Sequence, residues 1–297
     1  MTSILSRPAP SAPARAGRTV RRRAPRVSLT QAFYFIGFLV VTAAIMLPII
    51  IIVLTAFKPA AEVNAYPPTL TPTHWTLDNF RAIFSELPFA RLIGNSFVFA
   101  GGVTLFALVF DSLAAYALAR LDFRGSKVLL IVIIASLMIP FQATLIPIYQ
   151  LVSDLGWVNT FAGLILPRAA DAFGIFFLRQ FFLSLPRDLD NAARIDGASE
   201  FRVFWSVVLP NAIPALLTLG IFTFVNNWND LLWPLVFTTE SDHGTITSGL
   251  TLLTGPGGII PQGVMMAGAL IAVLPLAILF LLVQRRFIES VASSGLK

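Results

Sequence analysis

Long apolar segments alternate with short polar segments along the 297-residue chain. An uncharged run of about 20 residues is long enough for a helix to cross the hydrocarbon core of a bilayer. Five such runs are clear, and a sixth is interrupted by three charged residues but is otherwise apolar. The pattern predicts an all-α integral membrane protein with six transmembrane helices, at about 32–56, 92–118, 128–152, 160–182, 211–239 and 259–283.

Positive residues fall mainly in the segments that this prediction places in the cytoplasm. Residues 1–31, 119–127, 179–210 and 284–297 hold seven, three, four and three Lys or Arg, which together make 17 of the 21 in the chain. Because positive charge resists translocation, the bias predicts that both termini are cytoplasmic. Without the span at 160–182 the last two spans would be inverted, so the charge pattern supports all six.

The N-terminal segment 1–31 differs in composition from the transmembrane domain predicted at 32–297. Its seven arginines stand among Pro, Ala and Ser, which predicts a disordered basic tail. No aromatic residue interleaves with these arginines, so we expect lipid headgroups rather than nucleic acid as their neighbours.

Composition narrows the possible chemistry. Only 12% of the residues are charged, about half of what a soluble domain carries. The chain has no cysteine, its two histidines are far apart in sequence, and no phosphate-binding Gly-x-x-x-x-Gly-Lys-Ser/Thr motif occurs. The carboxylates of Asp188 and Asp190 could suggest glycosidase chemistry, but helix capping explains them better. We therefore predict neither an enzyme nor a cofactor in this chain.

The stretch "DNAARIDGASEFRVFWSVVLP" lies in the polar segment 183–210, between the fourth and fifth spans. Asp188 and Asp190 suit the first turn of a helix, and Gly197 is a natural end for it. Ser199 can cap a second helix, whose apolar positions are Phe201, Phe204, Trp205, Val208 and Leu209. From this pattern alone, a helix that lies on the bilayer surface remains an alternative to a docking element.

The stretch resembles the cytoplasmic "EAA" loop of ABC-importer permeases, in which Glu-Ala-Ala precedes a glycine and a later Leu-Pro. Ala192, Ala193, Gly197 and Leu209-Pro210 match, whereas Asn191 replaces the glutamate. Other stretches, among them "LTAFKP", "AAYALARLDFRG", "GIFFLRQFF" and "WNDLLWPLVF", resemble the carbohydrate-importer subfamily. Within it, the similarity is to the second permease subunit of maltose-type and glycerol-phosphate-type systems.

This resemblance implies a fold, a function and a set of partners. The fold is that of a type I importer permease with a cytoplasmic coupling helix, and the function is ATP-driven sugar import across a bacterial inner membrane. The implied partners are a second permease subunit, two copies of an ATPase and an external sugar-binding protein. An ion-gradient-driven transporter or channel is the alternative, although the chain lacks a duplicated half.

In such permeases the loop docks in a groove on the ATPase. The resemblance assigns this contact to Asp190, Asn191, Ala192, Ala193, Asp196, Gly197, Ala198 and Phe201. Phe201 and Trp205 are expected to secure the loop to the membrane domain. Because Asn191 stands in place of the glutamate, the salt bridge that the family forms there is left without its carboxylate.

Polar residues inside the predicted spans are candidates for the sugar path, because charge is costly in lipid. In "NNWND", the residues Asn226, Asn227, Trp228, Asn229 and Asp230 could line the path or pack between helices. Arg168 and Asp171 stand three residues apart and are expected either to pair with each other or to line the path. Asp111 is expected to face another helix, a headgroup or the pathway.

Overall fold

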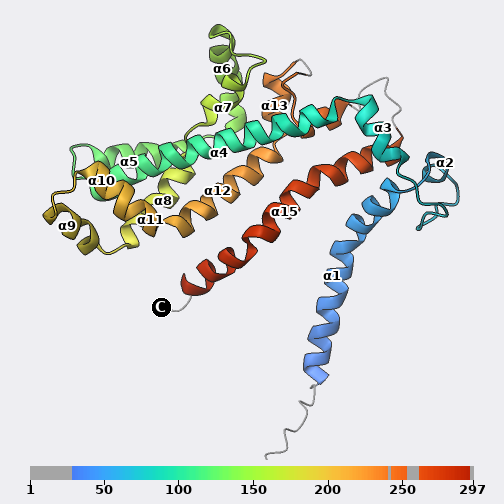
Figure 1. Ribbon diagram of the computed structural model, residues 1–297, viewed down its shortest axis with the longest axis horizontal. Coiled ribbons are helices and arrows are strands. Elements are labelled where there is room, and N and C mark those ends of the chain that lie inside the picture. Colours follow the sequence, from blue (N-terminus) through green and yellow to red (C-terminus); the bar gives the residue numbers. More distant parts are fainter. Residues whose placement is uncertain (1–28, 240–241, 253–260, 295–297) are drawn as a thin grey trace, which may run out of the picture. The chain divides into compact units, whose positions relative to one another are not determined.

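The structure, a computed structural model, describes residues 29–239, 242–252 and 261–294, and these residues form helices joined by turns (Figure 1). Within them no strand occurs, so the all-α prediction is confirmed for the described part of the chain. The chain divides into two compact units, residues 1–48 and 49–297. Most of the predicted basic tail, residues 1–28, lies outside the described residues.

Helix α1 (Leu29–Ala56) starts three residues before the first predicted span. In the first unit its apolar side chains are largely exposed, as at Phe33, which is 74% exposed. A 28-residue apolar helix with such an outer surface is long enough to cross a bilayer. The first predicted span is therefore a single helix.

The central helix of the second unit is α4 (Phe89–Arg120), which contains the second predicted span. Its 32 residues include no proline, and they make a helix about 48 Å long. Helices α8 (Ala172–Ser184) and α12 (Ile213–Trp228) pack along it. Glycines permit this close packing: Gly174 of α8 lies against Asp111, and Gly220 of α12 faces Leu108.

The third predicted span is two helices rather than one. Helices α5 (Ser126–Ser136) and α6 (Phe141–Asp154) meet at 101°. The break falls at Pro140, which has no N–H to donate and disfavours helical geometry at the residue before it.

The fourth and fifth predicted spans are also broken. Helix α7 (Phe161–Ile165) and a 3₁₀ turn (Leu166–Arg168) precede α8 at 44°. The predicted span at 211–239 consists of α12 and the separate helix α13 (Leu232–Phe237). At the start of α13, Oδ1 of Asp230 accepts a hydrogen bond of 3.1 Å from the N–H of Trp233.

Two further groups of helices complete the described fold. The segment between α8 and α12 holds α9 (Arg187–Ile195), α10 (Glu200–Val203), a π-helical turn (Phe204–Val208) and α11 (Leu209–Asn211). The helices α2 (Ala60–Val63), α3 (Asp78–Glu86) and α14 (Ile246–Leu252) belong to the predicted outer loops, and α15 (Gln262–Ser294) contains the sixth span.

The number of membrane crossings lies between three and six in the described residues. Helices α1, α4 and α15 are each long and apolar enough to cross alone. Three bent pairs pass the same test together, namely α5 with α6, α7 with α8, and the segment 200–211 with α12, which meet at 78°. Six crossings result if each bent pair is one span.

Three apolar clusters form the core of the second unit, and α4 contributes to all of them. The loop cluster is built around Tyr116, Phe182, Phe204 and Leu219. The α14 cluster is built around Leu92, Trp228 and Ile246, and the α6–α13 cluster around Phe99, Leu164, Trp233 and Phe237. Helix α4 is therefore the element that all three clusters share.

A side chain at Gly174 should disrupt the contact between α8 and α4. A Cβ there would overlap Oδ2 of Asp111 and lie 2.9 Å from its Cγ. We expect Gly174→Ala to cost about 1–3 kcal/mol, as overpacking usually does, measured as the thermal unfolding of purified protein in detergent. Gly101→Ala is the control, because nothing lies within 4 Å of a Cβ at that position of α4. Equal stability of the two variants would contradict the close contact.

Candidate functional site

The segment 186–210 forms the two short helices that the sequence predicts, joined at Gly197. Gly197 has φ = +82°, a left-handed conformation that glycine adopts without steric cost. Its N–H donates to the carbonyl of Arg194, and the N–H of Ala198 donates to that of Ala193, both at 3.0 Å. These two bonds form a Schellman motif, which satisfies the last carbonyls of α9 and fixes the direction of the turn.

The second helix begins at its predicted cap. Oγ of Ser199 accepts a hydrogen bond of 3.4 Å from the N–H of Arg202, so Ser199 is the N-cap of α10. The five-residue π-helical turn at Phe204–Val208 follows directly and leads to Pro210. Short π-helical insertions of this kind are frequent at functional sites.

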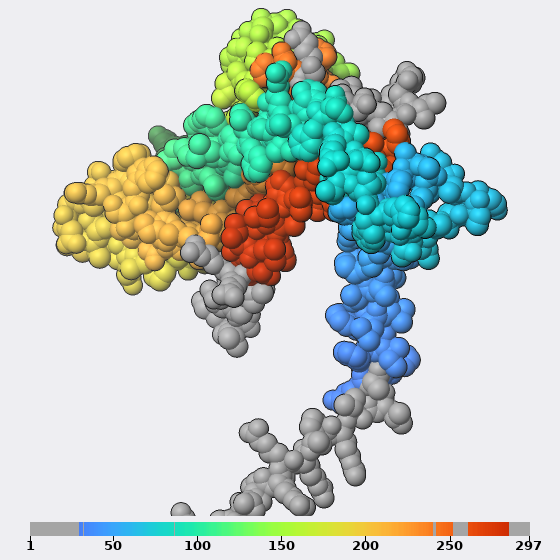
Figure 2. Space-filling view, turned by 45° about the vertical axis from the view of Figure 1, so that its right-hand side comes forward, coloured from blue at the N-terminus to red at the C-terminus, as the bar shows by residue number. Residues whose placement is uncertain are grey.

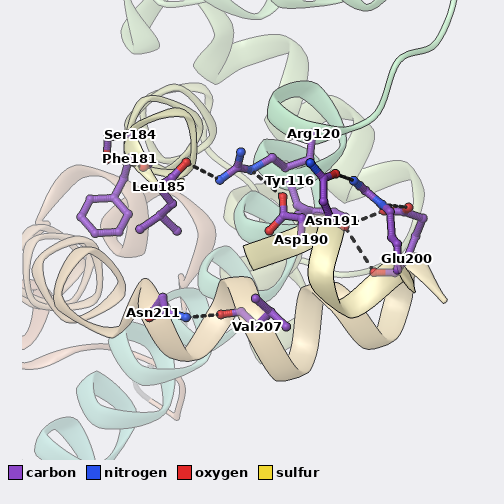
Figure 3. Close-up of polar contacts among 11 residues, drawn as sticks. Tyr116, Arg120, Phe181, Ser184, Leu185, Asp190, Asn191, Glu200, Val207 and Asn211 are labelled. Atoms are coloured by element: carbon purple, nitrogen blue, oxygen red, sulfur yellow. Dashed lines mark hydrogen bonds and ion pairs between the residues drawn. The ribbon is translucent and has the colours of Figure 1, made fainter. Parts of the chain in front are cut away.

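A buried ion pair attaches α9 to the end of α4 (Figure 3). Nε of Arg120 lies 3.2 Å from Oδ2 of Asp190, and the two side chains are 1% and 3% exposed. The Arg120 Nη2 also donates a bond of 2.9 Å to the carbonyl of Leu185, at the end of α8. The Nε–Oδ2 contact is a charge pair rather than an aligned hydrogen bond. Arg120 therefore joins α4, α8 and α9.

A second polar contact attaches α10 to α4. The hydroxyl of Tyr116 donates a hydrogen bond of 2.7 Å to Oε2 of Glu200, as Figure 3 shows. Arg194 of α9 binds the same carboxylate through Nε at 2.7 Å and Nη2 at 3.1 Å. The hydrogen bond to Glu200 raises the pKa of Arg194. Oδ1 of Asn191 accepts a further bond of 3.2 Å from Nη1 of Arg194. The two helices are thus held as one polar unit.

The exposed surface of helices α9 and α10 differs in part from the predicted ATPase contact. Ala192, Asp196 and Gly197 are exposed, and Ile195, which the resemblance did not assign, is 87% exposed. Figure 2 shows α9 and α10, in yellow and light orange, at the surface of the 49–297 unit. The exposed residues at the turn are therefore available to another molecule.

Five predicted residues have other positions than expected. Asp190 is buried in its ion pair, and Ala193 and Ala198 pack partly against the loop cluster, so these residues face the subunit itself. Phe201 is 66% exposed and Trp205 is 47% exposed, although the ring of Trp205 lies 5.5 Å from that of Phe204, so the anchoring role of these two residues stays a prediction.

The residues that anchor the loop by packing are Val203, Phe204 and Val208, of which Phe204 and Val208 were predicted on the apolar face. Phe204 packs on Tyr116 with the ring centroids 5.2 Å apart.

The residues of "NNWND" divide between the core and the surface. Trp228 is buried, its Nε1 donates to the carbonyl of Ala272 on α15 at 3.1 Å, and Asn227 is buried beside it. These two fit the packing alternative. Asn226 and Asn229 are exposed, and their place on a sugar path remains a prediction.

Arg168 and Asp171 do not pair with each other, so the expected i, i+3 pair is wrong. Arg168 forms an ion pair with Asp230. Its guanidinium lies 5.4 Å from the ring centroid of Trp233, a residue of the α6–α13 cluster. Asp171 instead caps α8, where its carboxylate accepts the N–H of Gly174 at 3.3 Å. The turn before α8 points the two side chains toward different elements.

Asp111 faces another helix, as one of its expected alternatives states. It is fully buried in α4, and its Oδ1 accepts the N–H of Asp171 at 2.9 Å. In the described part of the chain, no group of three His, Asp or Glu side chains could hold a metal ion. The geometry therefore presents an attached, exposed helical turn rather than a reaction centre.

No sequence pattern singled out Tyr116, Arg120 or Glu200 as part of this site. Arg120 carries a visible signal, since it is a single charge at the end of a long apolar run, but its partner is 70 residues away. Nothing in the local sequence of α4 identifies Asp190 as that partner.

Comparison with known proteins shows which family the chain is similar to. Residues 108–293 match the family of binding-protein-dependent transport system inner membrane components. The chain is 36% identical over 282 residues to an arabinooligosaccharides transport system permease protein, AraQ, of Halalkalibacterium halodurans, covering 93% of this chain and 99% of that protein. It is 34% identical to the sn-glycerol-3-phosphate transport system permease protein UgpE of Escherichia coli O1:K1 / APEC, covering 85% and 92%.

Solved structures show the same fold. A chain of a bacterial ABC transporter involved in the import of the acidic polysaccharide alginate superposes with a TM-score of 0.77 at 24% identity, covering 89% of this chain and all of that one. A chain of the MetNI methionine ABC transporter gives a TM-score of 0.52 at 17% identity. The type I importer permease fold is therefore confirmed. The chain belongs to the family of binding-protein-dependent transport system inner membrane components, the multi-pass permeases of ABC importers.

Proposed function

We propose that this chain is a permease subunit for a sugar or sugar derivative, and that it forms half of the translocation path beside a second, similar permease. The support is the 36% identity, over nearly the whole length of both chains, to a permease for arabinooligosaccharides. The glycerol-phosphate permease is similar to almost the same degree, so the class of carbohydrate and polyol derivatives is proposed rather than one sugar.

ABC importer permeases work with an ATPase and a binding protein, and the turn between α9 and α10 is the part of this chain that we assign to the ATPase. The observation that carries this assignment is an exposed turn whose two helices are attached to α4, α9 through Arg120 and α10 through Tyr116. Ile195, Asp196 and Gly197 stand at its surface. An element that transmits force needs such a stiff attachment, because a loose loop would absorb the displacement.

The four arginines of the segment 179–210 support a cytoplasmic location for this turn, on the side where ATP is available. A secondary transporter would have no use for a docking turn of this kind. The family assignment therefore favours the ATP-driven function over the ion-gradient alternative.

A charged side chain at Gly197 should block docking without unfolding the subunit. No atom lies within 4 Å of a Cβ at Gly197, so Gly197→Asp meets no clash inside this chain. Its left-handed backbone costs about 1–2 kcal/mol for a non-glycine residue. We expect sugar uptake to fall at least about tenfold, equivalent to about 1.4 kcal/mol at the contact, with normal amounts of protein in the membrane.

Gly125→Asp is the matched control, because Gly125 also has a positive φ, of +90°, and an open Cβ position. Docking itself is measured by cross-linking from Ile195→Cys, which is the sole cysteine in a chain that otherwise has none. Uptake by Gly197→Asp equal to that of Gly125→Asp would contradict the docking assignment.

Removal of one member of the buried ion pair should detach α9 from α4. Asp190→Ala leaves the charge of Arg120 buried and unpaired, which usually costs about 3–5 kcal/mol. We expect a lower midpoint of thermal unfolding in detergent and a loss of uptake. Asp188→Ala is the control, since Asp188 is exposed in the same first turn of α9. Comparable effects of the two substitutions would show that burial of the pair is unimportant.

The transported solute can be identified through the binding protein of the same system. We expect that protein to show a raised midpoint of thermal unfolding with a sugar, a sugar oligomer or a glycerol phosphate, because a ligand that binds only the folded state stabilises it. Stabilisation by amino acids or peptides, and by no carbohydrate or polyol, would contradict the proposed substrate class.

A further inference from the structure

Helix α4 holds the loop between α8 and α12 through two side chains on one of its faces. Tyr116 and Arg120 stand four residues apart, so both point to the same side of the helix. Tyr116 binds Glu200 of α10, and Arg120 pairs with Asp190 of α9. Both contacts lie at the end of α4 that meets α9 and α10 in Figure 1. Any displacement of this loop therefore acts directly on α4.

The opposite end of α4 holds a second segment, residues 242–246, which leads into α14. Nδ2 of Asn95 donates to the carbonyls of Asp242 and Gly244, at 2.8 and 2.9 Å. Oγ of Ser96 accepts the N–H of Ile246 at 2.8 Å. Asn95 and Ser96 are both buried, and Arg91 on the same helix forms an ion pair with Asp242. This segment is therefore fixed to α4 by its backbone.

The two attachment points are separated by one uninterrupted helix. Ser96 and Tyr116 are 20 residues apart, which at the rise of an α-helix is about 30 Å. The hydrocarbon core of a bilayer has about the same thickness. Helix α4 contains no proline, whereas the covalent continuation of the loop into α12 passes through a bend of 78°. Between the α9–α10 loop and residues 242–246, the straight helix α4 is thus a stiffer connection than the bent path through α12.

We propose that α4 carries the displacement of the docked loop across the membrane to the outer segment 242–246. Tyr116 and Arg120 are the positioning residues at the inner end, and Asn95 and Ser96 are those at the outer end. The inference rests on the proposed docking of the ATPase at the α9–α10 turn. It adds that ATP binding changes the surroundings of residues 242–246, and that this change passes through these side chains.

The test measures the outer segment in the assembled transporter, reconstituted in lipid vesicles. His243 is half-buried between the two residues whose carbonyls bind Asn95, and His243→Cys gives a unique label site in a chain without cysteine. We expect ATP to change the rate of maleimide labelling at this position by at least about fivefold, the lower end of usual allosteric coupling. Tyr116→Phe and Ser96→Ala, each a loss of one hydroxyl, should reduce this ATP effect to less than half.

Each hydroxyl variant has a matched control. Ser112→Ala removes an equally buried hydroxyl of α4 that donates only to Val109 of the same helix. Tyr149→Phe removes a tyrosine hydroxyl from α6. Both controls should keep the full ATP effect, and Ser96→Thr, which retains the acceptor, should restore it. If Ser96→Ala fails to assemble, Tyr116→Phe provides the test from the other end.

The outcomes separate the two proposals. If the Ile195→Cys variant cross-links to the ATPase but ATP leaves the labelling rate of the His243→Cys variant unchanged, transmission to residues 242–246 is wrong and docking stands. Transmission through α4 is equally wrong if both hydroxyl variants keep the full ATP effect. If the Ile195→Cys variant forms no cross-link to the ATPase, the docking assignment fails, and the inference about α4 fails with it.

Discussion

The attachment of the α9–α10 loop depends on one buried charge pair, Arg120 with Asp190. Two charges that are both almost fully buried are costly to desolvate, and removing either one leaves the other uncompensated. The arrangement is tolerable because Arg120 also donates to the carbonyl of Leu185, which would otherwise end α8 without a partner. One guanidinium thus fixes three helix ends, and this makes a short loop stiff enough to serve as a mechanical contact.

The same need for buried partners explains the polar residues within the broken spans. Each break frees backbone groups that must find partners where water is scarce. Asp111 accepts the free N–H of Asp171, and Asp230 accepts that of Trp233 at the start of α13. These two carboxylates therefore act as hydrogen-bond acceptors for backbone N–H groups at the starts of helices. The path for solute is then to be sought among exposed polar groups such as Asn226 and Asn229.

Replacement of the family glutamate by Asn191 does not leave the loop without an internal anchor. Asp190, one position earlier, carries the ion pair to α4, while the Asn191 amide oxygen binds Arg194. Arg194 in turn binds Glu200, which Tyr116 also holds. The pairing is distributed over both helices of the loop, so the turn at Gly197 is connected to α4 through both Asp190 and Glu200.

The sequence alone determined the helical class, the existence of the spans and the turn at Gly197, because apolar run length, positive charge and a left-handed glycine are local properties. The cap at Ser199 is local for the same reason. Only the tertiary structure decided the partners of Arg120, Arg168 and Asp111, since each partner lies in a distant part of the chain, up to 70 residues away. It also decided that, among the apolar positions predicted on one face, Phe204 and Val208 are buried whereas Phe201 is exposed. Local periodicity cannot report which helix a side chain will meet, and that is the physical limit of the sequence.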